Sequence, residues 1–184
     1  MKLAFITAFF VVLLLVGCNS EPSLQKYFVE NSEKKDFIAL DVSSSILNTD
    51  KTKLTTEQKT ALQSFDKMNI IAYKINDKNK DSFDAESAKV TRILKNDRYQ
   101  ELMKVGSGKD AASVSYVGDE DHIGEFVLFA KRKDNGFAVV RILGKDMNPN
   151  NILTMLSVLK SANIDMEQLK PLQGLVNQDK RIKG

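Results

Sequence analysis

The stretch 125-EFVLFAKRKDNGFAVVRIL-143 decides the fold, because it places two apolar runs on either side of a short polar loop. The runs cover residues 125–131 and 137–143 and are rich in the aromatic and β-branched side chains that favour strands. Asn135 and Gly136 end the loop, and this pair is a strong hairpin signal because both residues tolerate positive φ. The sequence therefore predicts an antiparallel hairpin.

Three further segments carry strand signals. Residues 37–42 (FIALDV) and 70–75 (IIAYKI) are compact apolar runs. Residues 113–116 (SVSY) alternate polar and apolar side chains, which is typical of a strand with one buried face. With the hairpin, these segments predict a sheet of about five strands.

Helical spacing of apolar residues predicts two helices in the first part of the chain. One covers residues 23–31. The other begins at Thr55, because Thr55 and Gln58 match a capping box. Its apolar face is formed by Ala61, Leu62, Phe65 and Met68.

The same spacing predicts further helices on both sides of the hairpin. The first carries Val90, Ile93 and Leu94, is interrupted at residues 96–97, and resumes with Tyr99, Leu102 and Met103 until Gly106 caps it. Asn148 and Pro149 then begin a helix with Ile152, Leu156 and Leu159 facing inward, and Asp165 opens a last one that Pro171 kinks or restarts.

The expected element order is therefore αβαβααβββαα. This order predicts a single α+β domain in which a mixed, mostly antiparallel sheet packs against helices. Residues 23–177 form the domain, and the polar residues 178–184 form a flexible tail.

The N-terminus carries a targeting signal. Residues 3–17 have no charge and follow Lys2, and the run is shorter than the roughly 20 residues that a bilayer span needs, which indicates a signal peptide over residues 1–17. The run ends in Leu15-Val16-Gly17-Cys18, which resembles a bacterial lipobox. The resemblance implies that the Cys18 thiol is lipidated and that the chain is cut before it, leaving residues 18–22 as anchor and tether. The alternative is an uncleaved membrane helix with an incidental cysteine.

Composition narrows the function classes. Removal of the signal peptide leaves 167 residues and lowers the net charge from +3 to +2, which gives no support for nucleic-acid binding. Cys18 is the only cysteine, so lipidation excludes disulfides and cysteine catalysis. Asn19, rather than Asp, follows the cysteine, and this favours the outer over the inner membrane.

The best metal candidates are Asp119, Asp121 and His122, which lie in one acidic segment near Glu125. Such a set could bind a hard cation or a transition metal, but the spacing does not match an EF-hand. We favour a solvated loop between two strands, and we predict no metal site and no cofactor.

Other motifs point to no catalytic residue. Residues 106–109 (GSGK) resemble a phosphate loop but lack the Ser or Thr after the lysine, and a helix cap and turn is the expected reading. The serines at 43–45 lack a nucleophile elbow, and a single histidine leaves little for a triad. Asp41 ends a strand, where a turn or cap role is expected. The basic loop at residues 131–133 could touch anionic lipid or a protein, although such loops are usually solvated.

Several stretches together resemble a bacterial lipoprotein family known as domain of unknown function 4252: "FIALDVS", "MNIIAYK", "YQELMKVGSG", "VSYVGDEDHIGEFVLFAK" and "DNGFAVVRILGKDMNP". The resemblance implies an envelope lipoprotein of gram-negative bacteria with one α+β domain. It supplies no catalytic residue. The expected function is therefore that of a membrane-anchored, periplasm-facing, non-enzymatic module that binds an envelope protein or has a regulatory role in the envelope. The alternatives are a small-ligand or lipid-binding module and a hydrolase that uses unrecognised carboxylates.

Overall fold

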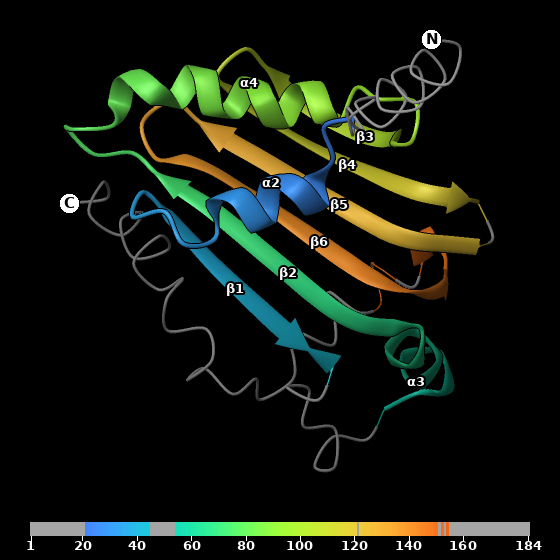
Figure 1. Ribbon diagram of the computed structural model, residues 1–184. Helices are drawn as coiled ribbons and strands as arrows, with labels where there is room; N and C mark the ends of the chain where they lie inside the picture. The colour runs from blue at the N-terminus through green and yellow to red at the C-terminus, as the bar shows by residue number, and fades with distance from the viewer. Residues whose placement is uncertain (1–20, 45–53, 121, 151, 153, 155–184) are drawn as a thin grey trace, which may run out of the picture.

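The computed structural model describes residues 21–44, 54–120, 122–150, 152 and 154. Its centre is a six-stranded sheet with the order β1-β2-β6-β5-β4-β3, shown in Figure 1. The strands are β1 (Phe37–Ser43), β2 (Phe65–Lys74), β3 (Gln100–Ser107), β4 (Asp110–Asp119), β5 (His122–Arg132) and β6 (Gly136–Met147). The helices are α2 (Leu24–Asn31), α3 (Thr56–Gln63) and α4 (Phe83–Ile93), with a 3₁₀ turn, η2 (Lys80–Ser82), before α4.

The α+β prediction is confirmed at the level of fold class, with two corrections to the sheet. All five neighbouring strand pairs are antiparallel, so the sheet is not mixed. It has six strands rather than about five, because residues 100–107 form a strand instead of the second half of a helix.

The predicted hairpin is confirmed and lies in the middle of the sheet as β5 and β6. Its turn differs in detail from the expected Asn-Gly turn. Arg132 pairs with Gly136 across a three-residue loop, and the Asn135 amide donates to the Arg132 carbonyl at 3.1 Å. Gly136 has φ +117°, and a Cβ there would collide with the carbonyl oxygen of Tyr73 on β2. Asn135 does not share the positive φ, so the glycine alone meets the conformational demand.

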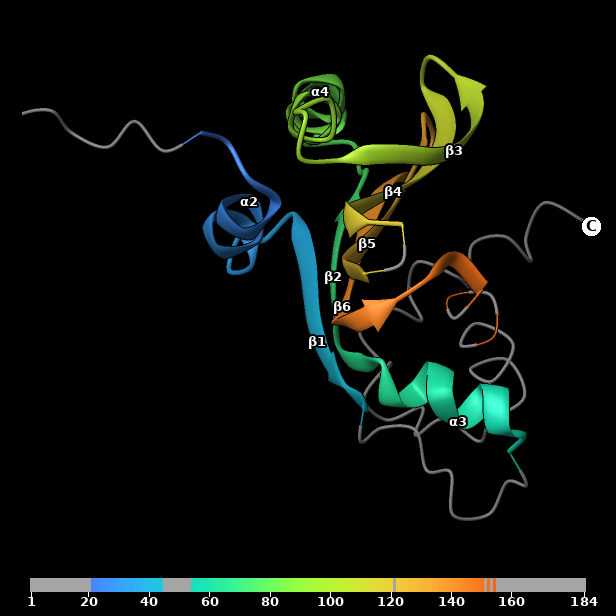
Figure 2. The same cartoon turned by 90° about the vertical axis from the view of Figure 1, so that its right-hand side faces the viewer.

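Helices α2 and α4 cover one face of the sheet, as the edge-on view in Figure 2 shows. The two helices fold because Leu24, Tyr27 and Phe28 of α2, and Phe83, Val90 and Ile93 of α4, fall at helical spacing and face the strands. The buried side chains of this face form one cluster: Leu24, Tyr27, Phe28, Ile71, Tyr73, Phe83, Val90, Ile93, Tyr99, Val127, Phe129, Phe137 and Val139.

The alternate residues of the same strands point to the second face, on whose side α3 lies (Figure 2). Their buried side chains form a second cluster: Val42, Phe65, Ile70, Tyr116, Ile123, Phe126, Ile142, Met147 and Ile152. Both faces of the three central strands therefore carry core residues.

The second predicted helix begins where expected but ends early. Thr55 and Gln58 form the predicted capping box, with the Gln58 amide donating to Thr55 Oγ1 at 3.2 Å and the Thr55 amide donating to Gln58 Oε1 at 2.9 Å. The helix stops at Gln63, and Phe65 already begins β2. Phe65 and Met68 therefore belong to a strand, because pairing with β6 satisfies the backbone of this segment and buries Phe65 on the second face.

The prediction of a helix after residue 96 is also wrong. Its apolar residues Leu102 and Met103 fit helical spacing, yet β3 pairs with β4 along its whole length. An irregularity between Glu101 and Met103 leaves Leu102 as an extra residue, and this bulge breaks the simple alternation of a strand. Gly106 is not a helix cap, since it lies in the β3–β4 hairpin with φ +73°.

The chain after β6 turns into a helix at Pro149, as predicted, with the Ile152 amide donating to the Asn148 carbonyl at 3.4 Å and Ile152 buried. The predictions for Leu156, Leu159, Asp165 and Pro171, for the tail, and for the signal peptide with Cys18 lie outside the described residues. Of the helices in the described ranges, none combines the length and the apolar character needed to cross a lipid bilayer.

Candidate functional site

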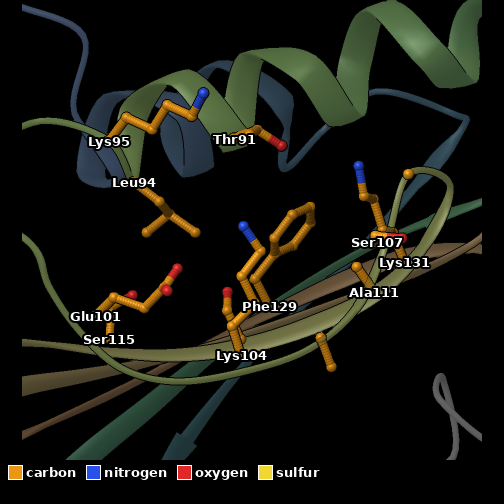
Figure 3. A pocket seen from close by; sticks show the side chains of 13 residues that line it. Thr91, Leu94, Lys95, Glu101, Lys104, Ser107, Ala111, Ser115, Phe129 and Lys131 are labelled. Atoms are coloured by element: carbon orange, nitrogen blue, oxygen red, sulfur yellow. The ribbon is translucent and has the colours of Figure 1, made fainter.

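A cleft of about 190 Å³ opens between the end of α4 and strands β3, β4 and β5 (Figure 3). Small side chains create it: Ala111, Ser113 and Ser115 follow one another on the helix-facing side of β4, leaving space beneath α4. The lining residues are Thr91, Leu94, Lys95, Glu101, Lys104, Ser107, Gly108, Ala111, Ala112, Ser113, Ser115, Phe129 and Lys131.

Strand register brings the charged residues of the cleft together. Ser113 on β4 pairs with Lys104 on one side and Phe129 on the other, so Lys104 and Phe129 lie in one row across the sheet with Ser113 between them. Lys131 on β5 pairs with Ala111, one row further along the sheet. Figure 3 shows both lysines rising from the sheet towards α4, which carries Thr91, while Lys95 comes from the turn after that helix.

The cleft is positively charged. It contains three ammonium groups, on Lys95, Lys104 and Lys131, and one carboxylate, on Glu101. Within the described part of the chain, none of the three lysines has an acidic partner within salt-bridge distance. Lys109, just outside the cleft, differs, because its Nζ lies 2.6 Å from Asp84 Oδ2.

Uncharged groups complete the cleft. The Thr91 hydroxyl donates to the Ser87 carbonyl at 2.9 Å, so towards the cleft its oxygen can act only as an acceptor. Ser113 and Ser115 supply hydroxyls from β4. Leu94 and Phe129 provide apolar contact. With one carboxylate and no histidine or cysteine, this cleft is suited to binding a small anion rather than to acid–base chemistry.

A buried ion pair lies further along the same face of the sheet. Arg141 Nε donates to Glu125 Oε1 at 2.7 Å, and the two side chains are 6% and 5% exposed. Arg141 Nη1 also donates to Gln25 Oε1 of α2 at 2.7 Å, and its guanidinium lies 5.5 Å from the centre of the Phe28 ring. Burial, with a further contribution from the Glu125 charge, raises the pKa of Tyr99 nearby. The pair therefore joins α2 to the sheet.

Strand β3 forms one edge of the sheet and is exposed along its length. It carries three of the four large apolar side chains that are most exposed in the described chain: Leu102 at 47%, Met103 at 55% and Val105 at 55%. Met103 and Val105 border a shallow apolar depression on the second face with Val114, Leu128 and Val140.

The predicted metal candidates are only partly described. Asp119 and His122 face each other across the β4–β5 turn, and His122 Nδ1 lies 2.8 Å from Asp146 Oδ1 at the solvent-exposed surface. Asp121 lies outside the described residues. Among the residues that are described, no three His, Cys, Asp or Glu side chains gather in a way that could hold a metal ion.

The other sequence motifs lie in strands and turns of the sheet. Gly106 and Ser107 end β3, and residues 108–109 form the turn to β4, so the phosphate-loop geometry is absent there, although Ser107 and Gly108 border the cleft. Asp41 lies within β1 and accepts a hydrogen bond from the Asn69 side chain on β2. Ser43 ends β1.

Sequence reasoning missed the cleft and the buried ion pair. The sequence indicates Lys131 only as part of a basic loop, and it predicts a helix for the segment that contains Lys104. The sequence offers one signal for the ion pair: each strand of the central hairpin contains a charged residue, Glu125 or Arg141. Charged residues that are buried in a strand are normally paired.

Comparison with known proteins identifies a family for this chain but no individual relative. No curated protein and no solved structure matches the chain. A family model described as a domain of unknown function matches residues 27–155, from the middle of α2 past the end of β6. The match covers more than half of the chain, including all six strands, and the protein belongs to the family of domain of unknown function 4252.

Proposed function

We propose that the protein is an envelope lipoprotein, anchored through lipid on Cys18, whose domain binds another envelope protein along strand β3. The observation that carries the binding proposal is the exposed apolar edge strand. The anchor rests on the sequence of residues 1–18, and Asn19 favours the outer membrane as the place of anchoring.

The anchor has a direct test. Two or more acyl chains hold a protein stably on a membrane, because each buried CH₂ contributes about 0.8 kcal/mol. Cys18→Ala should move the full-length protein from the membrane fraction to the soluble fraction and abolish labelling by radioactive palmitate. Ser20→Ala is the matched control and should stay in the membrane fraction. A C18A protein that still pellets with membranes would contradict the anchor.

The edge strand suits an extended, apolar partner segment. An edge strand presents unpaired backbone N–H and C=O groups, and a partner strand can bond to them by β-augmentation. Met103 and Val105 would then supply apolar contacts beside the added strand. The bulge at Leu102 and the charge of Lys104 limit unspecific pairing, since both are devices that protect sheet edges. The partner is therefore a protein with an extended segment rather than a small molecule.

In-cell photo-crosslinking tests the proposed surface. A photoreactive residue at position 105 should capture a partner protein, and capture should fall about tenfold or more when Met103→Lys is added, since loss of a central apolar contact costs about 1.4 kcal/mol or more. Val29→Lys is the matched control, because Val29 is 68% exposed and lies on α2. Equal loss in V29K, absence of capture, or capture of only a second copy of this chain would overturn the proposal.

The hydrolase alternative would need carboxylates that converge on a cleft. The cleft beneath α4 contains one carboxylate, Glu101. A second cleft, between α2 and strands β1 and β2, also contains one, Asp41. The buried Glu125 is held by Arg141. We therefore prefer the partner-binding function.

A further inference from the structure

The cleft beneath α4 has an excess of positive charge that its own surroundings do not balance. The carboxyl end of α4 adds about half a negative charge, and Glu101 adds one. Among the groups that line the cleft, the three lysines outweigh both and leave about +1.5. The Glu21 carboxylate, which accepts from Asn96 beside Lys95, lowers this to about +0.5. A ligand of this cleft is therefore an anion.

The shape of the cleft limits the ligand to a small group. A volume of about 190 Å³ lies below the range of about 300–1,000 Å³ that is typical of drug-sized ligands. Lysine binds phosphate as a point charge, whereas arginine binds carboxylate and phosphate in a planar, bidentate geometry. The hydroxyls of Ser113 and Ser115 can donate to phosphate oxygens, and Phe129 offers apolar contact to the attached alcohol.

The beginning of the domain is fastened next to this cleft. The Asn96 side chain donates to Glu21 Oε2 at 3.1 Å, and Asn96 directly follows Lys95 of the cleft. Glu21 follows Cys18 by three positions, and a chain of that length reaches at most about 11 Å. With the proposed anchor in place, the end of α4 therefore lies within about one or two Debye lengths of the lipid headgroups, where anionic lipid attracts lysines.

We propose that this cleft binds the phosphate group of an anionic phospholipid in the membrane that holds the anchor. Lys104 and Lys131 contact the phosphate from the sheet, and Lys95 contacts it from the end of α4. The contact fixes how the tethered domain is oriented on the bilayer. This inference rests on the proposed anchor for its source of ligand, and on the cleft for its chemistry.

Lysine footprinting on the full-length lipidated protein tests the proposal. The protein is reconstituted in vesicles of phosphatidylcholine alone or with phosphatidylglycerol and treated briefly with an acetylating reagent, and each lysine is quantified by mass spectrometry. With phosphatidylglycerol, acetylation of Lys95, Lys104 and Lys131 should fall about fivefold, as expected at about four-fifths occupancy. Lys59 and Lys145 are internal controls, since both are exposed outside the cleft, and should change less than about twofold.

Matched variants distinguish binding in the cleft from general electrostatic attraction between lysines and anionic lipid. In a Lys104→Gln, Lys131→Gln double variant, phosphatidylglycerol should no longer protect Lys95. In a Lys59→Gln, Lys145→Gln variant, which has the same change in net charge, protection should persist. Uniform protection of all lysines, or no protection of the three, would overturn the cleft as a site.

Two further arms identify the source of the phosphate and separate this proposal from the anchor. Protection by soluble glycerol phosphate in phosphatidylcholine vesicles, as strong as that by phosphatidylglycerol, would assign the cleft to a soluble phosphate ester and contradict a lipid headgroup. If the mass of the N-terminal peptide shows that Cys18 is not lipidated, the anchor fails. In that case dihexanoyl phosphatidylglycerol below its micelle concentration still tests the cleft, and failure to protect the three lysines overturns it.

Discussion

At the scale of single residues, the ion pair between Glu125 and Arg141 is distinguished by burial, since the two side chains are 5% and 6% exposed. Removing two charges from water is costly, and the pair persists because each remaining group has a partner: Gln25 accepts from Arg141, and the Phe28 ring lies against its guanidinium. Arg98, at 4.0 Å from Glu125, adds a weaker contact. The pair therefore specifies where α2 sits on the sheet.

Breaking this pair should be strongly destabilising. Glu125→Ala leaves the Arg141 charge buried without its carboxylate, and we expect a loss of about 3–5 kcal/mol in the free energy of unfolding. Glu30→Ala is the control, since the Lys26–Glu30 pair spans 3.9 Å at the exposed surface of α2 and should contribute less than about 1 kcal/mol. Urea unfolding followed by circular dichroism measures both. A similar small effect in the two variants would contradict the structural role of the pair.

Tyr27 should make the protein sensitive to alkali. Burial, and then the nearby Glu86 charge and hydrogen bond, raise the pKa of Tyr27 far above its ordinary value of 10.0. Below pH 10 the folded and unfolded states both hold the proton, so the group makes no pH-dependent contribution. Above pH 10 only the unfolded state releases it, and stability falls by up to about 1.4 kcal/mol per pH unit.

The Tyr27→Phe variant isolates this contribution. Its free energy of unfolding, measured in urea between pH 8 and pH 11, should fall less steeply above pH 10 than that of the wild type. Glu86 accepts the Tyr27 hydroxyl at 3.2 Å, so the variant also loses a hydrogen bond, but that loss is independent of pH up to 10. Identical slopes in the two proteins would show that Tyr27 does not ionise on unfolding in this range.

At the scale of elements, β3 and the central hairpin differ in what specifies their structure. The β5–β6 hairpin is specified locally, because its turn residues and apolar runs agree with one another. Strand β3 is specified by its neighbour, since its backbone is satisfied by β4 and its own residues fit a helix as well as a strand. Elements whose local and tertiary preferences coincide are the ones that sequence reasoning identifies.

The hairpin depends on Gly136. In Gly136→Ala, the new Cβ would meet the Tyr73 carbonyl at a φ that other residues rarely adopt, and we expect a loss of about 2 kcal/mol or more. Gly124→Ala is the control within β5, because nothing lies within 4 Å of its added Cβ. Thermal unfolding of both variants compares them. A melting temperature of G136A equal to that of the wild type would contradict the turn geometry.

At the scale of the whole molecule, one sheet holds two cores. Successive residues of β2, β5 and β6 alternate between the cluster under α2 and α4 and the cluster on the second face: Ile71 and Val127 belong to the first, and Ile70 and Phe126 to the second. Because the same strands contribute side chains to both clusters, unfolding of either cluster disrupts the other. The domain should therefore unfold as one unit.

Tryptophan reporters test this cooperativity, since the chain has no tryptophan of its own. Phe28→Trp reports on the first face and Tyr116→Trp on the second, and both positions are 8% exposed. In each variant, the urea midpoint from tryptophan fluorescence should coincide with the midpoint from far-ultraviolet circular dichroism. Separate midpoints in either variant would show that one face unfolds independently.

The sequence by itself determined the fold class, the central hairpin, the capping box at Thr55 and the family resemblance. These features depend on neighbouring residues: periodic apolar positions, turn chemistry and local hydrogen bonds. Tertiary structure alone decided that residues 65–68 and 100–107 are strands, that the sheet is wholly antiparallel, and that Lys95, Lys104 and Lys131 share one cleft. The reason is physical: strand pairing satisfies backbone groups between segments far apart in the chain, and spacing within one segment carries no record of that partner.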